Sequence, residues 1–598
     1  METPPELAAL EKPLVDGLAD ALRAGAPDLD DARSRAAAEQ VIRGQALPDD
    51  VARLFGDRPV CTLVGFDADA IQSWVFDSER VQVASGASHV LDKLNRQVNQ
   101  QPGGIVGEHG IRGVLYSAGG GGVLFAEVPG DPEALVRTTR DWLEARSHEL
   151  TFTVVAANLC VADLAPSNAG GALPAAGPLA LDRFRVVGGI RGALVRLQVA
   201  MRDAKDARPR PATARVDRKK GETRAERCPS CGRRPPGKRP VLDASPGYWC
   251  EWCRGLRKVY LDRPENRRKE DDKAVTFADL AESVERRRQY LGFIAVDGNS
   301  MGAVVQSVGS LRQLRAFSEA TTRIYEAARQ RAREVLRPYL KDVNDEEESS
   351  LSLLSGGDEI TLVLPAAAAP EVALEVLEAI ERGFDQATGP DGLLHEAFKD
   401  DRTILERLRN AGAAAGVIAA HANYPVRLLR RYANELQKNA KSTCPRPNRS
   451  AVSWLLLTDS SPLTEKLEAS PGDEDWSVAA FRRRLREVKL AVDHKVAASA
   501  LQAILGYCRD EERSIRSLAG NSREGVVDLL AANFFRYQLA RNDALGNWWQ
   551  ALVADDPDLR REDDQHDSIG RWFHRGGRRR LEQIVDLLSL QPFVEDKA

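Results

Sequence analysis

The stretch "LLSGGDEITLVLP", residues 353–365, is typical of a β-hairpin that carries two adjacent acids at its tip. Apolar runs flank the pair Gly356 and Gly357, and Asp358 and Glu359 follow directly. Apolar runs separated by a glycine turn predict two paired strands, and glycines let a ligand approach the backbone closely. Neighbouring carboxylates repel each other unless a cation neutralises them. The tip is therefore a candidate metal site; the alternative is an ordinary polar turn.

The segments around this hairpin follow the order strand, helix, hairpin, helix, strand. The predicted elements are a strand at 290–298, a helix at 318–336, the hairpin, a helix at 370–384 and a strand at 413–421. A further helix (426–441) and strand (451–459) close the unit. This order predicts a ferredoxin-like α+β sheet with helices on one face.

The same order occurs earlier in the chain. The predicted elements are a strand at 59–69, a helix at 87–98, a hairpin at 113–129, a helix at 131–146 and a strand at 150–159. Laying the hairpins together sets the run 118–122 (AGGGG) on the run 355–359 (SGGDE). The first copy thus has glycines where the second has acids. We expect only the second copy to hold metal, and the first to bind nucleotide at Gly119, Gly120 and Gly121.

A third acid belongs to the candidate site. Asp297 ends the first strand of the second unit, next to "GNSMG". In a ferredoxin-like sheet that strand lies beside the hairpin, so Asp297 is expected to meet Asp358 and Glu359 at one edge. Carboxylates and substrate phosphates are the ligands that Mg²⁺ prefers, and Mn²⁺ accepts the same set. Two such metals activate an attacking hydroxyl and stabilise a leaving pyrophosphate.

Other residues are candidates for holding a nucleotide. Ser355, Gly356 and Gly357 precede the acids at the hairpin tip. Lys441 ends a predicted helix shortly before a strand, from which it could reach a triphosphate. The alternative is a cation placed favourably at a helix C-terminus.

Four of the eight cysteines form two close pairs. Cys228 and Cys231 make one C-x2-C pair, Cys250 and Cys253 make the other, and eighteen residues separate the pairs. This spacing is typical of a four-thiolate zinc site. Four thiolates leave no open position for substrate, so the predicted zinc is structural.

Composition places limits on the class of protein. The 598 residues carry a net charge of -4, and 43% of them are hydrophobic. No apolar run approaches the roughly 20 residues of a membrane span, and the acidic start is unlike a secretory signal, so we expect a cytoplasmic protein with no membrane contact. From 202 to 239, fourteen basic residues face five acids, which fits either phosphate binding or a solvated linker. The expected domains are a helical lead-in (1–57), a first sheet unit (58–200), a basic cysteine segment (201–275), a second sheet unit (276–464) and a helical domain (465–598).

These features together resemble the large palm-polymerase subunit of type III CRISPR effector complexes. The stretch at 66–94, FDADAIQSWVFDSERVQVASGASHVLDKL, resembles that family's first-palm opening, and "VDGNSMG" resembles its second-palm strand and turn. The cysteine insert lies between the two palms, "SGGDEITLVLP" stands where the family has a GGDD hairpin, and a helical domain closes the chain. The resemblance covers roughly residues 58–598.

The resemblance implies a fold and an activity. The fold would be two palm domains with a zinc-ribbon insert and a C-terminal α-helical domain. The partners would be a guide RNA, a target RNA and other effector subunits. Target binding would switch on conversion of ATP to cyclic oligoadenylates, each palm holding one ATP and the second palm alone holding Mg²⁺ or Mn²⁺. ATP, rather than GTP, is implied by the resemblance alone.

Two departures from the family pattern affect these expectations. Only about 57 residues precede the first palm and none is a histidine, so we expect no HD nuclease domain. The hairpin has Glu359 where the family has aspartate, which retunes or weakens the site. Two alternatives stay open: a non-catalytic scaffold of an RNA-guided complex, and a cyclic dinucleotide synthase related to GGDEF diguanylate cyclases, which generally have one palm per chain.

Overall fold

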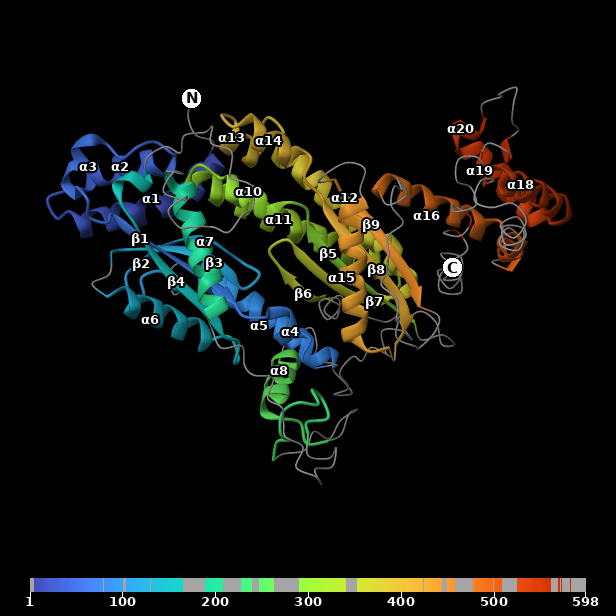
Figure 1. The fold of residues 1–598 in the computed structure, drawn as a ribbon, viewed down its shortest axis with the longest axis horizontal. Helices are drawn as coiled ribbons and strands as arrows, with labels where there is room; N and C mark the ends of the chain where they lie inside the picture. The colour runs from blue at the N-terminus through green and yellow to red at the C-terminus, as the bar shows by residue number, and fades with distance from the viewer. Residues whose placement is uncertain are drawn as a thin grey trace.

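The computed structural model of the chain contains two sheets, a cysteine-bearing segment and a separate group of helices (Figure 1). It describes residues 5–78, 80–99, 104–128, 131–164, 189–207, 227–238, 247–262, 290–339, 352–422, 424–443, 449–457, 477–497, 499–507, 524–560, 568–569, 572, 581 and 584. Most of the basic stretch between the first sheet and the cysteines lies outside these ranges.

The first sheet has four strands in the order β2-β3-β1-β4, all antiparallel. They are β1 (Cys61–Ala68), β2 (Ile111–Ala118), β3 (Gly121–Ala126) and β4 (Phe152–Leu159). Its helices are α4 (Ile71–Val75), α5 (Val81–Asn99), α6 (Pro132–Glu144), η1 (Val161–Leu164) and α7 (Gly189–Ala207). This is the ferredoxin-like order, with α7 packed on β1 and β4.

The second sheet repeats that order and adds one strand, giving β6-β7-β5-β8-β9. Its strands are β5 (Tyr290–Gly298), β6 (Ser352–Gly356), β7 (Glu359–Pro365), β8 (Ala413–His421) and β9 (Ala451–Leu457), with β9 parallel to β8. Its helices are α10 (Met301–Ser307), α11 (Leu311–Leu336), η5 (Arg337–Tyr339), η7 (Ala366–Ala368), α12 (Ala369–Ala387), α13 (Leu393–Phe398), α14 (Arg402–Arg409) and α15 (Val426–Thr443). Helix α15 packs on β5, β8 and β9, as α7 packs on the first sheet.

Strand β8 is buried along almost its whole length because small residues let a helix approach it. Eight of its nine residues are buried, and the sequence is AAAGVIAAH. A Cβ placed on Gly416 would lie 1.9 Å from the carbonyl oxygen of Ala433 in α15. The glycine therefore sets how closely α15, and with it Lys441, approaches the sheet.

Helices extend the molecule at both ends. Helices α1 (Pro5–Gly25), α2 (Asp31–Ile42) and α3 (Asp49–Phe55) precede the first sheet. Helix α8 (Glu251–Leu261) follows the cysteines and packs against α5. The last helices are α16 (Val478–Asp493), α18 (Glu524–Arg541), α19 (Asp543–Asp555) and α20 (Pro557–Arg560).

The buried apolar side chains of the described residues form a large core, a second, separate core and a small cluster of three alanines. The large core joins both sheets, the N-terminal helices and the cysteine segment. The second core lies within the last helices and contains Phe535, Trp548 and Trp572. Helix α16 links them, because Phe481 belongs to the large core and Ala491 to the second. The prediction of an α+β fold with two sheet units, a cysteine insert and C-terminal helices is confirmed.

The expected alignment of the two hairpins was wrong by one residue. In the first sheet, Asp67 at the end of β1 pairs with Gly121. In the second sheet, Asp297 at the end of β5 pairs with Glu359. Glu359 is therefore matched by Gly121, and not by the next residue as the sequence comparison had it. Aligning glycines by their letters could not reveal which residue each strand pairs with.

In the corrected register, the first hairpin still has glycines where the second has acids. Each hairpin turns over two residues, and the turn of the second hairpin ends in Asp358 where the first has Gly120. The first sheet therefore has glycines at both positions at which the second has acids.

Candidate functional site

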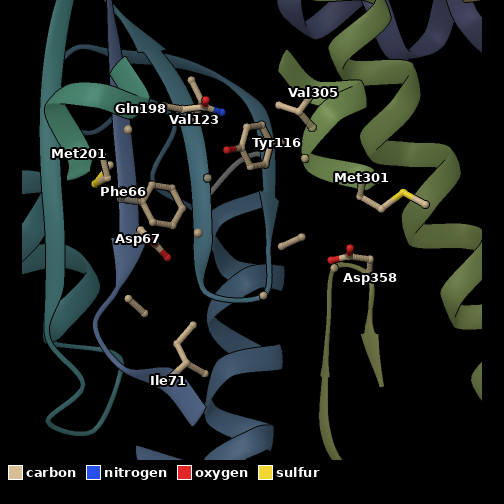
Figure 2. Close-up of a pocket in the computed structure, with 18 of the residues that line it drawn as sticks. Phe66, Asp67, Ile71, Tyr116, Val123, Gln198, Met201, Met301, Val305 and Asp358 are labelled. Carbon is tan, nitrogen blue, oxygen red and sulfur yellow. The ribbon is translucent and has the colours of Figure 1, made fainter. Parts of the chain in front are cut away.

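A cavity of about 880 Å³ lies between the two sheet units, and both hairpin tips contribute to its lining. The first unit contributes Asp67 and Gly121, and the second contributes Asp358 and Glu359. Figure 2 shows Asp67 on the first-unit side and Asp358 at the tip of the facing hairpin. The volume falls within the range of small-molecule sites, about 300–1,000 Å³.

Asp297 lies at the end of β5 and is held by two side chains of α15. The Lys441 ammonium is 2.5 Å from the Asp297 Oδ2 and 2.9 Å from the Gly298 carbonyl oxygen. The Gln437 amide donates to the same Oδ2 at 2.9 Å. In this structure the lysine therefore neutralises the Asp297 carboxylate, and neither of these two residues is among those that line the cavity.

Of the two hairpin acids, Asp358 has the less favourable electrostatic surroundings for its ionised form. Burial, and then the negative charges of Asp297 and Glu359, raise the pKa of Asp358 to about 6. Burial and Asp297 also raise the pKa of Glu359, although Gln72 and Arg430 oppose the change. The site therefore has more negative charge than its own cations compensate.

Gly298 makes room for this arrangement. Its amide donates to the Asp358 carbonyl oxygen at 3.0 Å. A Cβ on Gly298 would lie 2.9 Å from the Asp358 Cβ and 2.7 Å from the Tyr325 hydroxyl. The glycine after the strand-ending acid is therefore required for the hairpin tip to close over β5.

The Tyr325 hydroxyl provides a test of whether a cation fits here. It is fully buried and has no hydrogen-bond partner among the described residues. Burial, with the charges of Asp358 and Asp297, raises its pKa well above the usual range, so it remains a donor. An unsatisfied hydroxyl beside under-neutralised carboxylates fits a hydrated divalent ion, whose bound water would donate a hydrogen bond to the tyrosine oxygen.

The three acids share an edge without forming a compact ligand group. A compact group would have the ligand atoms of three or more His, Cys, Asp or Glu side chains within 4.8 Å of one another. Among the described residues, only the four cysteines form such a group. Side-chain rearrangement, including release of Asp297 by Lys441, would accompany binding of a cation by all three acids.

The first unit repeats the strand-end acid and its lysine, a pair that sequence reasoning missed. Asp67 occupies on β1 the register position that Asp297 occupies on β5. Lys205 of α7 forms an ion pair with Asp67, as Lys441 of α15 does with Asp297. The signal in the sequence was the acid that ends the strand in both copies, followed by a lysine near the end of the matching helix.

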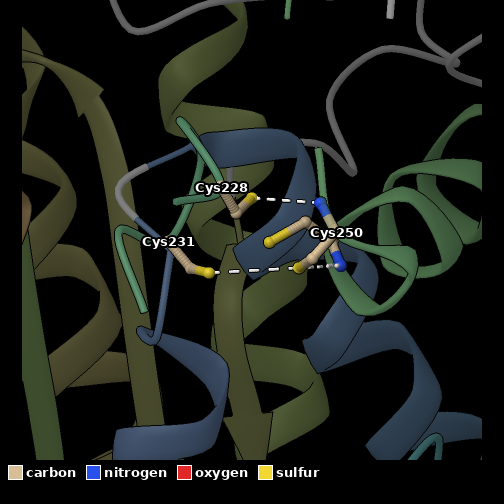
Figure 3. A group of neighbouring side chains, drawn as sticks. Cys228, Cys231 and Cys250 are labelled. Atoms are coloured by element: carbon tan, nitrogen blue, oxygen red, sulfur yellow. Dashed lines mark hydrogen bonds between the residues drawn. The ribbon is translucent and has the colours of Figure 1, made fainter. Parts of the chain in front are cut away.

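The cysteine prediction agrees with the observed geometry. Cys228, Cys231, Cys250 and Cys253 are all buried, and their sulfur atoms lie within 4.8 Å of one another. Figure 3 shows the side chains of Cys228, Cys231 and Cys250 directed toward one another. Sulfurs bound 2.3 Å from one tetrahedral zinc stand about 3.8 Å apart, so the cluster fits that ion.

The cysteine segment is docked on the first unit beside α4. The Asp77 carboxylate forms ion pairs with Arg233 and Arg234, each at 2.6 Å. The Ser78 hydroxyl lies 2.7 Å from that of Ser230. The buried contacts tie the cysteine cluster to the segment that runs toward the second unit.

Among the described residues, no helix is long and apolar enough to cross a membrane.

Comparison with known proteins identifies part of the chain. Residues 290–451 match the family model described as Cas10/Cmr2, second palm domain. The matched region begins at β5 and ends at the start of β9, and it contains Asp297, Asp358, Glu359 and Lys441. No curated protein matches the sequence.

Several solved structures match most of the chain at low sequence identity. The crystal structure of a Csm1–Csm4 cassette in complex with pppApA matches with 15% identity and a TM-score of 0.47, covering 93% of this chain and 74% of that one. The apo cassette matches with 13% identity and a TM-score of 0.48 over the same shares. A Csm1–Csm4 subcomplex of the type III-A CRISPR-Csm interference complex matches with 14% identity and a TM-score of 0.43, again over 93% and 74%.

Proposed function

We propose that this chain, a Cas10-like large subunit whose second palm spans residues 290–451, synthesises cyclic oligoadenylates from ATP within a type III CRISPR effector complex. The observation that most supports this proposal is that two hairpin tips, one acidic and one built of glycines, line a single cavity. One nucleotide would lie on each tip, so that the 3′-hydroxyl of one faces the α-phosphate of the other.

The residues of the second palm would bind the metal and the triphosphate. Asp358, Glu359 and Asp297 would hold Mg²⁺ or Mn²⁺, which when bound acidifies the attacking hydroxyl and neutralises the leaving pyrophosphate. Lys441 would turn from Asp297 to the triphosphate as the cation replaces it, because one ammonium cannot neutralise both fully. Gly356 and Gly357, with Ser355 before them, leave space for phosphate oxygens at the tip.

The first palm would position the second nucleotide without a metal. Gly119 and Gly121 line the cavity, whereas Gly120 turns inward, where an added Cβ would meet Ile71 at 2.7 Å. Asp67 is already paired with Lys205, and no second acid stands beside it on the tip. Reaction then consists of positioning and of neutralising charge on the α-phosphate as the O3′–P bond forms and the bond to pyrophosphate breaks.

Guide RNA, target RNA and other effector subunits are the proposed partners, and the cytoplasm is the proposed location. In the similar solved structures, Csm1 is bound to Csm4. The test is to incubate the assembled complex with ATP, Mn²⁺ and matched target RNA, and to identify the products by mass. The D358A/E359A variant should retain assembly and guide-RNA binding but lose turnover by about a hundredfold or more.

The control distinguishes an enzyme from a scaffold. A D141A variant removes an exposed carboxylate on α6 of the first palm, away from the cavity lining, and leaves the site acids intact, so it should assemble and turn over ATP like the parent. Parental turnover that persists in D358A/E359A would contradict the enzyme proposal and favour the scaffold. Products made from GTP would instead favour the GGDEF-like alternative.

A further inference from the structure

One side chain of the first palm contacts an acid of the second across the cavity wall. The Gln72 amide nitrogen donates to the Glu359 Oε1 at 3.4 Å, joining residues 287 positions apart. Gln72 belongs to the short helix α4, which begins directly after the turn that follows β1. Both side chains also line the cavity. The contact therefore places a first-palm residue at the second palm's acidic tip.

Arg430 of α15 determines which end of the Gln72 side chain faces the acid. Its guanidinium donates to the Gln72 backbone carbonyl oxygen at 3.0 Å and also to the side-chain amide oxygen, Oε1, of Gln72. Because a guanidinium only donates, the amide oxygen must face Arg430 and the amide nitrogen must face Glu359. The guanidinium itself lies 4.7 Å from the centre of the Phe76 ring. Gln72 is thus held in one orientation by a group that is packed in place.

The length of Glu359 is suited to this contact. An aspartate at the same position would end one methylene earlier, about 1.5 Å short. The donor–acceptor distance is already 3.4 Å, so the shorter acid would not reach the Gln72 amide without movement of the backbone. The glutamate of GGDE is therefore explained by a partner in the other palm.

We propose that Gln72 is a positioning residue, which holds the Glu359 carboxylate at the edge of the cavity and links its orientation to the docking of the two palms. The proposal rests on the proposed function, since it assigns Glu359 to the metal-binding edge. It adds to that function a dependence of the second palm's acids on a side chain of the first.

A double-mutant cycle tests the contact. The Q72L variant should lower kcat for ATP by about tenfold or more with less than a twofold change in KM. The loss of one hydrogen bond to a charged group typically has an effect of that size on a rate. E359D should also be slower than the parent. Adding Q72L to the E359D background should have almost no further effect, because the shorter acid has already lost the contact. Equal losses from Q72L in both backgrounds, or an E359D variant faster than the parent, would overturn the proposal.

Arg427 provides a matched control for general loosening of the interface. It donates to the carbonyl oxygens of Phe76 and Asp77, so R427M weakens the same contact between the palms without touching Glu359. R427M should lower kcat less than Q72L does. If the two variants have equal effects, Gln72 acts only through the interface, and the positioning role is wrong.

Mn²⁺ binding separates this proposal from the proposed function. Electron paramagnetic resonance of the complex with Mn²⁺ alone should show weaker Mn²⁺ binding and an altered spectrum in Q72L relative to the parent. Q72L/E359D should show no further change relative to E359D. That difference would support the positioning role even if the parent made no product from ATP, an outcome that would contradict only the synthase. An unchanged spectrum and affinity in Q72L would overturn the positioning role, and a parent that binds no Mn²⁺ would overturn both.

Discussion

At the scale of single residues, the candidate site has more carboxylates than cationic side chains to neutralise them. Asp297 has Lys441 and Gln437 as direct partners, whereas Asp358 lies half-buried near two other carboxylates. Burial and like charge both disfavour the ionised form of an acid, so Asp358 retains a proton to a higher pH than an exposed aspartate does. The same features make a divalent cation the natural partner of the ionised form.

A pH dependence of metal binding follows from Asp358. Its pKa of about 6 in the metal-free chain means that a proton occupies the carboxyl below that pH and competes with the metal. Since the folded pKa is raised, protonation favours the folded, metal-free chain, and this contribution is lost as the pH rises through about 6. Mn²⁺ affinity measured by titration calorimetry should therefore fall about tenfold from pH 7 to pH 5.

The D358N variant is the control for that titration. It should bind Mn²⁺ more weakly at pH 7 and lose most of the dependence between pH 5 and 7. A parental affinity that does not change over this interval would show that protonation of Asp358 does not compete with the metal.

At the scale of elements, the two hairpins differ in what their tips can accept. Gly121 has an ordinary backbone conformation, lines the cavity, and would place a Cβ 3.3 Å from the Asp67 Oδ1. Gly120 has φ of 86°, so a side chain there strains the turn whether or not a ligand is present. Gly121 is therefore the cleaner position at which to test nucleotide binding by the first palm.

The G121L variant should weaken binding of ATP to the complex, with an increase of about tenfold or more in KM, because the side chain occupies space intended for phosphate. Fluorescent-nucleotide titration and steady-state kinetics measure this. G506L, at a helical position with nothing within 4 Å, is the control and should bind ATP like the parent. Unaltered affinity in G121L would place the second nucleotide elsewhere.

The cysteine cluster is an element that we expect to bind zinc. Elemental analysis of the purified chain should find about one zinc per chain, and C228S/C231S should lose it, because two remaining thiolates cannot complete the shell. Cys160, a half-buried cysteine outside the cluster, is the matched control, and C160S should keep the zinc. Undiminished zinc in C228S/C231S would refute the site.

At the scale of the whole molecule, the chain is an asymmetric pair of related units. Both units have an acid that ends the first strand and a lysine that neutralises it, but only the second adds acids at the hairpin. We therefore expect metal on one side of the cavity only. D297A should lose Mn²⁺ binding by about tenfold or more, whereas D67A should retain the parental Mn²⁺ stoichiometry in the same titration. Loss of a bound ion in D67A would show that the first palm also holds metal.

The sequence alone was sufficient for the order of elements and for the expectation that Asp297, Asp358 and Glu359 lie at one edge of a sheet. Alternating apolar runs, glycine turns and the spacing of Cys228, Cys231, Cys250 and Cys253 are local patterns, and each predicts its structure from neighbouring residues. Asp297 was found because an acid that ends a strand is visible in one short stretch.

Only the tertiary structure decided the register of the hairpins and the contacts between the units. The pairing of Asp67 with Gly121, and of Asp297 with Glu359, depends on which backbone groups meet across a sheet, and a one-residue shift leaves the letters equally well matched. The Gln72–Glu359 contact joins residues 287 positions apart. Such contacts arise from the packing of one folded unit against another, and no local periodicity encodes them.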